Sequence, residues 1–326
     1  MPNRNGFFCR VLPAAVCGTI VEMSFEIRNP TSQDLDALET LLNASFQYDA
    51  NESYCVDFAP LFSNTTLESS RIITKNGTIA ASGALHVSRV KVGSESFKAG
   101  IIGAIATAPQ HRNAGLASQV LAELEGLALR HNCETLVLWS DQVAFYEKLG
   151  FKAAGTQEIY LLTELFAAIN EKNLDRILNE TKGSAAYGWN EEVKALYQNH
   201  VFRCERTPEY WAELEKIRTC TRLQWLNEQG EATAYLAYNR GKDLKGVVHE
   251  WGGEGNALTK LAAVAASKNS DLTWLTHPGL ADPIMGLAEN RTSLKPLMQS
   301  HLALFKPLTS RVIDYSKFWF WGLDSL

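Results

Sequence analysis

The chain of 326 residues carries a formal net charge of -5, with 46% hydrophobic and 21% charged residues. This balance is typical of a globular protein and excludes disorder over most of the length, while the mild acidity argues against a nucleic-acid partner beyond a local phosphate site. The length exceeds that of one typical domain and suits two.

The first residues have some features of a targeting segment. Two arginines precede an apolar run from Val11 to Val21, which Pro13 interrupts, and no small-residue cleavage site follows. A second methionine, Met23, stands just before the first expected strand. We therefore expect residues 1–22 to be a disordered N-terminal extension, and a cleaved signal peptide stays the alternative.

Membrane and metal chemistry have little support in the sequence. No stretch of eighteen apolar residues occurs, so no membrane-spanning helix is expected. The six cysteines are scattered and include no C-x-x-C pair, which argues against a disulfide framework or a zinc site. We expect a cytoplasmic protein that binds no metal, no membrane and no nucleic acid.

Strands and helices alternate over the first half. A capping sequence at Thr31 predicts a helix start, and Asn76-Gly77 predicts a hairpin. In chain order we expect a strand at 25–28, a helix from 31, a polar loop at 47–66, strands at 71–74, 78–92 and 97–107, a helix from 115, a strand at 135–139, a helix at 143–149 and a strand at 152–162. Glycines in the strand at 97–107 predict a bulge or a close backbone approach.

The junction between the strand ending at Thr107 and the helix starting near Gly115 predicts an anion site. The amides of residues 113–118 are free N-terminal donors, and the helix dipole favours negative charge there. Gly115 lets a phosphate approach the backbone, and Arg112 adds a fixed positive charge. We expect a pyrophosphate-binding loop, with a plain capped helix as the alternative.

A second motif follows, and the two together carry a family resemblance. The segment Phe145–Phe151 reads FYEKLGF, and the loop before the helix reads R-x-x-G-x-A at Arg112, Gly115 and Ala117. In this order and spacing they resemble the GNAT superfamily of acyl-CoA-dependent N-acyltransferases over about residues 24–162. The resemblance implies an α/β (α+β) fold, with a mixed, mostly antiparallel sheet flanked by helices.

The resemblance also implies roles for individual residues. The pantetheine arm of acetyl-CoA would lie between the fourth and fifth strands, and Tyr146 would be the general acid that protonates the leaving thiolate; a packing role for Tyr146 is the alternative. The donor would be bound by residues of the fourth strand, the loop and the fifth-strand end, namely Ile105, Ala106, Thr107, Arg112, Asn113, Ala114, Gly115, Leu116, Ala117, Ser118 and Ser140.

Two positions depart from the family pattern. Many GNAT sequences have an asparagine where this chain has Trp139, so Ser140 or Asp141 would replace its contact. The strand at 97–107 lacks the glutamate that serves some members as general base. His86, His111, Asp141 and water stay open as the base.

Three carboxylates fall in the loop where GNAT enzymes often bind the acceptor. Asp49, Glu52 and Asp57 would suit a cationic amine there. The alternative for each is a solvated polar loop.

The second half repeats the element order of the first without its motifs. The equivalent junction, Trp251–Asn256, has no arginine, and Glu254 would repel a pyrophosphate. We expect a GNAT domain at 23–163 and a degenerate GNAT-like domain at 164–326, an arrangement that resembles the tandem Eis-type and mycothiol-synthase-type acyltransferases.

The C-terminal segment is dense in aromatic residues from Phe318 to Trp321. We expect it to pack into the core, with an exposed interaction patch as the alternative. In Eis-like enzymes the chain terminus comes near the active site, so the resemblance also implies that Asp324 or Leu326 approaches the substrate.

The sequence thus predicts an N-acetyltransferase that passes acetyl from acetyl-CoA to a primary amine of a small molecule or peptide by direct attack. A non-catalytic acyl-CoA sensor is the alternative. The acceptor, the acyl preference and the oligomeric state stay open.

Overall fold

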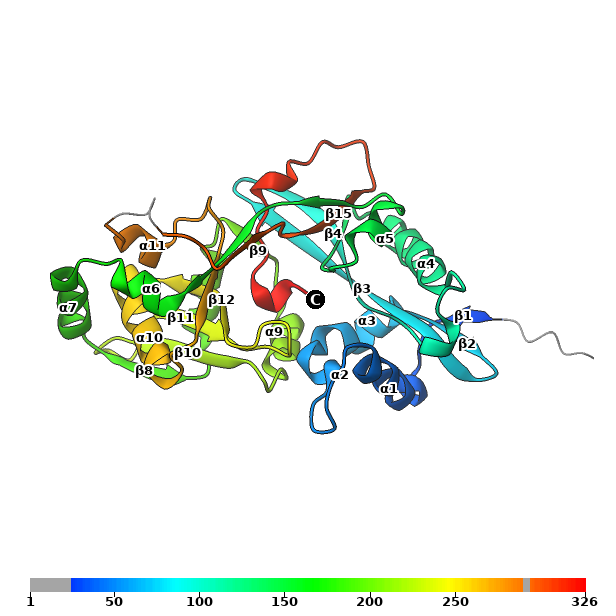
Figure 1. Ribbon diagram of the computed structural model, residues 1–326, viewed down its shortest axis with the longest axis horizontal. Coiled ribbons are helices and arrows are strands. Elements are labelled where there is room, and N and C mark those ends of the chain that lie inside the picture. The colour runs from blue at the N-terminus through cyan, green and yellow to red at the C-terminus, as the bar shows by residue number, and fades with distance from the viewer. Residues whose placement is uncertain (1–24, 290–293) are drawn as a thin grey trace, which may run out of the picture.

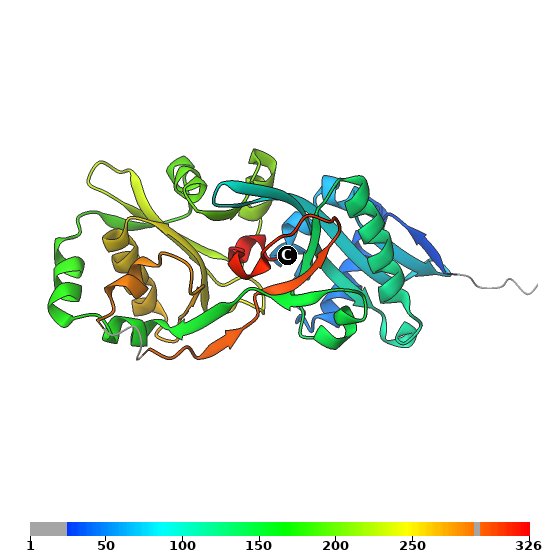
Figure 2. The ribbon, with the colours of Figure 1, turned by 90° about the horizontal axis from the view of Figure 1, so that it is seen from above.

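The computed structural model describes residues 25–289 and 294–326, so the expected N-terminal extension lies outside the described residues. The molecule is elongated, with two β-sheets along its length and helices packed on each (Figure 1). The last residues lie between the two sheets in both perpendicular views (Figure 2). No helix in the described part of the chain is long and apolar enough to cross a membrane.

The first sheet has eight strands, and its one parallel pair is β4–β5. The path runs β1 (Glu26–Arg28), β2 (Arg71–Lys75), β3 (Thr78–Val92), β4 (Glu95–Thr107), β5 (Thr135–Leu138), β15 (Ala303–Pro307) and β6 (Lys152–Ala154), with β9 (Phe202–Cys204) paired to β3. The expected hairpin forms at Asn76-Gly77, where both residues have positive φ angles, 53° and 75°. The mixed, mostly antiparallel architecture expected from the sequence is confirmed.

Helices cover both faces of this sheet. The apolar face of α1 (Leu35–Ser45) packs in one core cluster, and that of α4 (Leu116–Arg130) packs in another, together with α5 (Val143–Glu147). The α4 stripe recurs every three or four residues, at Val120, Leu121, Leu124 and Leu127, as a helix buried on one side requires.

The prediction of a polar loop at residues 47–66 is wrong. This segment contains α2 (Tyr54–Asp57), η2 (Ala59–Phe62) and the start of α3 (Asn64–Glu68). The hydroxyls of Ser53 and Ser63 accept hydrogen bonds from Val56 N and Thr66 N and so cap α2 and α3. These helices span about one turn each, which is too short for a periodic apolar pattern to reveal them.

The two sheets exchange strands. The prediction of a single strand at 152–162 is wrong. The chain turns at Gly155 (φ 71°) and forms two strands there, β6 in the first sheet and β7 (Gln157–Leu161) in the second. Later, β15 returns to the first sheet and pairs with β5 and β6. The domain boundary at residue 163 stays a prediction, and strands from each side of it complete the sheet of the other.

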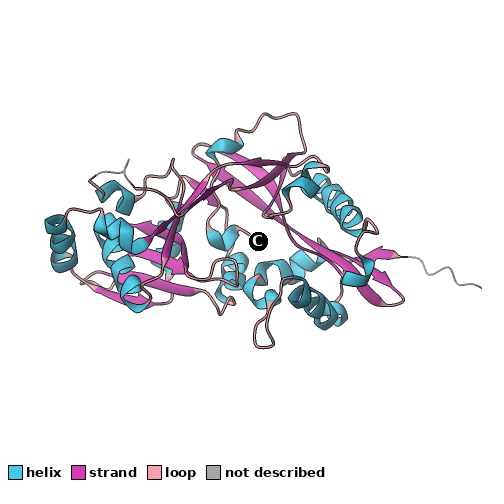
Figure 3. Cartoon of the chain, viewed as in Figure 1, coloured by secondary structure: helices cyan, strands magenta, loops and turns pink. Residues whose placement is uncertain are grey.

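The second sheet has seven strands and a similar plan. Its path runs β14 (Met298–Ser300), β7, β13 (Thr273–Thr276), β12 (Val247–Gly253), β11 (Ala232–Tyr238), β10 (Thr221–Leu226) and β8 (Ser184–Tyr187). Its helices are α6 (Leu162–Ala167), α7 (Glu171–Glu180), α8 (Glu191–Gln198), α9 (Pro208–Glu215), α10 (Gly255–Lys268) and α11 (Pro283–Leu287) (Figure 3). As in the first sheet, one parallel pair, β12–β13, is linked by a helix.

Tryptophans occupy the end of that parallel pair in the second sheet. Trp251 donates from Nε1 to the Leu275 carbonyl (3.1 Å) and so bridges β12 and β13 beyond their last paired residues. Trp274 stacks on its ring, with centroids 5.2 Å apart, and Trp321 contacts it edge-on at 5.1 Å. The space between these strands is therefore filled by indole rings.

The aromatic C-terminal segment packs as expected. Phe318, Trp319, Phe320 and Trp321 are each at most 3% exposed. Trp321 also donates from Nε1 to the Phe202 carbonyl (2.9 Å), which ties the segment to β9. The segment is therefore part of the core between the two sheets.

Candidate active site

The strands β4 and β5 diverge after a short parallel pairing, from Ala99↔Thr135 to Ile101↔Val137. Just beyond, the register of β4 against β3 shifts, and Ala104 adopts a positive φ of 55°. Ser82 Oγ donates to the Ala104 carbonyl (3.0 Å), and the Tyr54 hydroxyl accepts from the Ala104 amide (3.3 Å). These contacts hold a bulge that bends β4 away from β5. The bulge expected in this strand is confirmed, next to Gly103.

A cavity of about 690 Å³ lies at this divergence. Its wall comes from the ends of β4 and β5 and from α5, and also from the segment after α1, from α2 and from the second half of the chain. The lining residues used below fall into two sets by their place in the chain: Ile105, Ser140, Asp141 and Tyr146, called the first side, and Phe46, Tyr48, Tyr54, Phe58, Lys242, Asp243, Phe320 and Leu326, called the second side.

Tyr146 lies in the cavity wall and is 6% exposed. The rings of Phe145 and Phe151 contact it edge-on, with centroids 5.0 and 5.7 Å away, and fix its orientation. Burial raises the pKa of its hydroxyl to about 12, although a hydrogen bond with Ser140 opposes the shift. The phenol is therefore protonated at neutral pH and can donate a proton into the cavity.

The N-terminus of α4 is open to solvent. Gly115 is its N-cap with φ 74°, and residues 112–115 are exposed, whereas the Leu116 side chain is buried and anchors the helix. A Cβ at Gly115 would meet nothing within 4 Å, so the space beside this backbone is free. The first-turn amides have no partner within the helix, which makes this end suitable for an anion.

The remaining predicted donor-binding residues connect the cavity to this helix. Ile105 lines the cavity, and Ala106 and Thr107 continue β4 toward the loop, paired with Ser82 and Ala81. Asn113 adopts a positive φ of 63° in the loop, and Ala114, Ala117 and Ser118 flank or follow Gly115. The whole predicted set therefore follows one path from the cavity to the exposed end of α4.

The three predicted base candidates differ in their surroundings. His86 is half-buried, its ring stacks on Tyr210 with centroids 4.6 Å apart, and desolvation lowers its pKa to about 4. His111 lies edge-on to Phe25, with centroids 5.6 Å apart. Of the three, Asp141 is the one that lines the cavity.

The loop carboxylates already have partners. Lys242 Nζ lies 3.3 Å from Asp49 and 3.1 Å from Glu52. Asp57 is 2% exposed and accepts a hydrogen bond from the Thr219 hydroxyl, and burial raises its pKa. The three carboxylates thus hold the first half to residues 219–242 of the second half.

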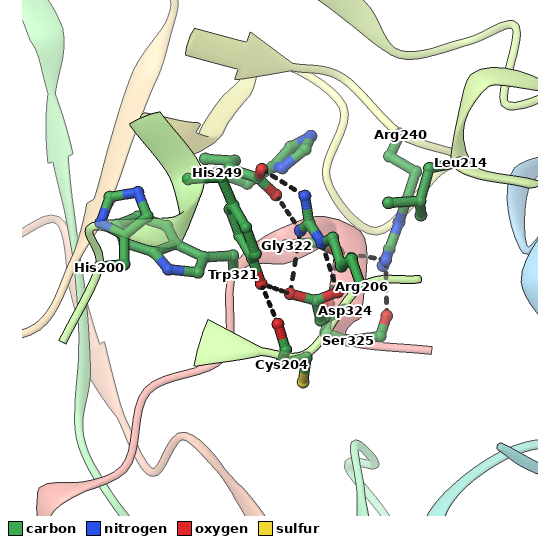
Figure 4. A network of polar contacts seen from close by, with 12 residues as sticks. His200, Cys204, Arg206, Leu214, Arg240, His249, Trp321, Gly322, Asp324 and Ser325 are labelled. Atoms are coloured by element: carbon green, nitrogen blue, oxygen red, sulfur yellow. Dashed lines mark hydrogen bonds and ion pairs between the residues drawn. The ribbon is translucent and has the colours of Figure 1, made fainter. Parts of the chain in front are cut away.

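A buried ion cluster anchors the C-terminal segment (Figure 4). Arg206 donates to both carboxylate oxygens of Glu250 (2.8 and 2.7 Å) and to both of Asp324 (2.9 Å each). The Tyr197 hydroxyl donates to Asp324 (2.9 Å), and its ring lies 3.9 Å from the guanidinium carbon. The side chains of the Arg206, Glu250 and Asp324 ion pairs are fully buried. Asp324 is therefore a structural residue and does not line the cavity.

A second buried arginine holds the residues beside Asp324. Arg240 donates to the carbonyls of Gly322 and Ser325 (2.6 Å for Ser325) and to the Asp243 carboxylate (2.7 Å). Gly322, Ser325 and Leu326 line the cavity, and a Cβ on Gly103 would lie 3.1 Å from the Leu326 carbonyl carbon. Of the two C-terminal residues implied to approach the substrate, Leu326 is thus at the cavity wall.

Metal ligands do not converge in the described ranges. Within residues 25–289 and 294–326, no group of three or more histidine, cysteine, aspartate or glutamate side chains is placed to hold a metal ion.

Comparison with known proteins gives a family for the first half. A family model described as an acetyltransferase (GNAT) domain matches residues 26–154. These residues form a GNAT domain. The structure explains why the match ends there, since β6 ends at Ala154 and the chain then leaves for the second sheet.

Solved structures share the fold over most of the chain. A GCN5-related N-acetyltransferase from Anabaena variabilis ATCC 29413 superposes with a TM-score of 0.64 and 16% identity, covering 88% of this chain and 73% of that one. The corresponding protein from Kribbella flavida gives 0.61 and 13%, covering 88% and 71%. Saccharomyces cerevisiae N-myristoyltransferase with bound myristoyl-CoA gives 0.54 and 11%, covering 90% and 87%. No curated protein matches the sequence.

The cavity extends beyond the GNAT domain itself. Four of its lining residues come from outside the matched residues, namely Lys242, Asp243, Phe320 and Leu326. The first three were not predicted from the sequence as site residues. No local pattern marks these residues, because the exchange of strands between the sheets brings them to β4. The aromatic residues Tyr48, Tyr54 and Phe58 were hidden in the segment taken for a polar loop.

Proposed function

We propose that this protein is an acyl-CoA-dependent N-acyltransferase that passes acetyl from acetyl-CoA to a primary amine of a small molecule or peptide. The observation that carries the proposal is the protonated Tyr146 hydroxyl in a cavity where β4 and β5 diverge, on one path with the open end of α4. Membership of residues 26–154 in the GNAT superfamily supports the acyltransferase class.

Donor binding is assigned to the backbone of β4 and α4. The amides of residues 113–118 and the Arg112 guanidinium would bind the pyrophosphate, since residues 112–115 are exposed at the helix N-terminus. The backbone of residues 105–107 would pair with the pantetheine amides, because β5 has diverged from β4 there. Ser140 would stay a partner of Tyr146 near the sulfur.

The chemistry is a direct transfer. The neutral amine attacks the thioester carbonyl carbon, the C–N bond forms and the C–S bond breaks. Tyr146 gives its proton to the departing thiolate, and Asp141 or water accepts the proton that the amine loses. Solvent then returns a proton to Tyr146 and takes up the proton that the amine lost, so the net products are one amide and one free CoA thiol.

An amine screen tests this proposal. Purified protein, acetyl-CoA and single amines are followed with a thiol-reactive dye, with acetyl-CoA hydrolysis as background. We expect at least one amine to release CoA thiol well above that background. Binding of acetyl-CoA without release by any amine would contradict the enzyme and favour the non-catalytic sensor.

Replacement of Arg112 by alanine tests the donor site. Because an exposed phosphate contact contributes about 1 kcal/mol, we expect KM for acetyl-CoA to rise about 3- to 10-fold with little change in kcat. Arg130→Ala, at the exposed opposite end of α4, is the matched control. An unchanged KM for acetyl-CoA in Arg112→Ala would show that Arg112 does not bind the donor.

A further inference from the structure

The second side of the cavity is walled by stacked aromatic rings. The ring of Tyr54 stacks between Phe46 and Phe58, with centroids 4.5 and 4.4 Å away, and Tyr48 contacts it edge-on at 5.7 Å. Phe46 remains 38% exposed, although it is a large apolar side chain at the cavity wall. An exposed aromatic surface inside a cavity is a binding surface for an apolar group.

The carboxylates around Lys242 and Arg240 already have cationic partners. Lys242 pairs with Asp49 and Glu52 and lies in the wall itself, and Asp243 pairs with the buried Arg240. A polycation near the rings would meet the Lys242 ammonium and carboxylates that already have cationic partners, whereas Asp141 lies beside Tyr146. The polycation would lose hydration near the rings without gaining an ion pair.

The donor and acceptor are expected to enter from different sides. Ile105, Ser140 and Tyr146 line the cavity and belong to the residues proposed to bind the donor. The aromatic rings share the cavity wall with Lys242 and with Phe320, which lies edge-on to Trp139 at the end of β5 with centroids 5.3 Å apart. The group that contacts the rings is therefore the body of the acceptor.

We propose that the acceptor is a compact amine carried on an apolar, preferably aromatic, body, and that Phe46 and Lys242 determine this preference. The proposal rests on the proposed function and names the substrate class of that site. Phe46 attracts the apolar body, and Lys242 neutralises the carboxylates that would otherwise attract a polyamine.

A competition among defined amines tests the proposal. With acetyl-CoA saturating, we expect kcat/KM for 2-phenylethylamine to exceed that for spermidine at least about tenfold, as removal of a fitted apolar group from a pocket commonly costs. Phe46→Ala is expected to raise KM for 2-phenylethylamine about tenfold and to leave kcat/KM for ethylamine within about twofold.

Lys242→Ala tests the charge argument in the opposite direction. Freeing Asp49 and Glu52 is expected to raise kcat/KM for spermidine about 3- to 10-fold, because exposed ion pairs are individually weak. Tyr187→Ala and Lys216→Ala, both at exposed positions away from the cavity, are the matched controls.

The outcomes separate this inference from the proposed function. A protein that acetylates spermidine better than 2-phenylethylamine, or a Phe46→Ala variant that weakens ethylamine and 2-phenylethylamine equally, overturns the acceptor class alone. A protein that acetylates none of the amines overturns both proposals.

Discussion

Replacing Arg206 by methionine is expected to lower the free energy of unfolding by about 3–5 kcal/mol, because two buried carboxylates would lose their cation. Glu250 and Asp324 are fully buried in these ion pairs, and both depend on the one guanidinium. Burial already raises the pKa of Glu250, against the effect of Arg206, so the remaining charges would be strongly destabilising. The measurement is denaturant unfolding, read as a lower midpoint with an unchanged slope.

Three further variants make this test decisive. Arg311→Met removes exposed ion pairs with Glu95 and Glu134 and should cost no more than about 1 kcal/mol. Combining Arg206→Met with Glu250→Gln and Asp324→Asn should recover part of the loss, since no net charge stays buried. If Arg206→Met alone does not fold, Asp324→Asn gives a milder loss. Equal stability of Arg206→Met and Arg311→Met would contradict a structural role for the cluster.

Replacing Tyr146 by phenylalanine is expected to lower kcat by about 100-fold or more, because a positioned general acid typically contributes at least that factor. The dissociation constant for acetyl-CoA should be unchanged, since the ring and its contacts with Phe145 and Phe151 remain. Steady-state kinetics and calorimetric binding measure the two quantities. A kcat within about threefold of wild type would favour the packing role of Tyr146.

The dependence of kcat/KM on pH is a second test of the role of Tyr146. The amine attacks in its neutral form, so kcat/KM should rise with pH toward the pKa of the free amine. Burial raises the pKa of Tyr146 to about 12, so loss of its proton should not lower the rate below about that pH. Tyr187→Phe, at an exposed position on β8, is the control and should keep both the rate and the profile.

Local sequence signals predicted the parts of the site that local physics determines. The Asn76-Gly77 turn, the Gly115 start of α4 and the FYEKLGF helix each depend on a few adjacent residues, and each lies where it was expected. The roles of Tyr146 and of residues 105–107 came from the family resemblance and stay predictions, while the structure places Tyr146 and Ile105 in the cavity wall.

The remaining features depend on contacts between distant residues. Gly155 lets the chain turn between the sheets, but a single glycine in a strand pattern also fits a bulge. The apolar run of β15 does not say which sheet it joins, and β15 lies between β5 and β6. Lys242 and Phe320 reach the cavity only through that exchange, so no spacing in the sequence could have placed them there.

The central claim is that acetyl passes directly from CoA to an amine where β4 and β5 diverge. The most direct measurement is the ratio of CoA thiol released to N-acetylated amine formed, read by mass spectrometry with the best amine of the screen, together with the intact mass of the protein. We predict one thiol for each acetylated amine and an unchanged protein mass. Thiol release without acetylated amine, or a protein that carries an acetyl group on the way to product, would contradict the account.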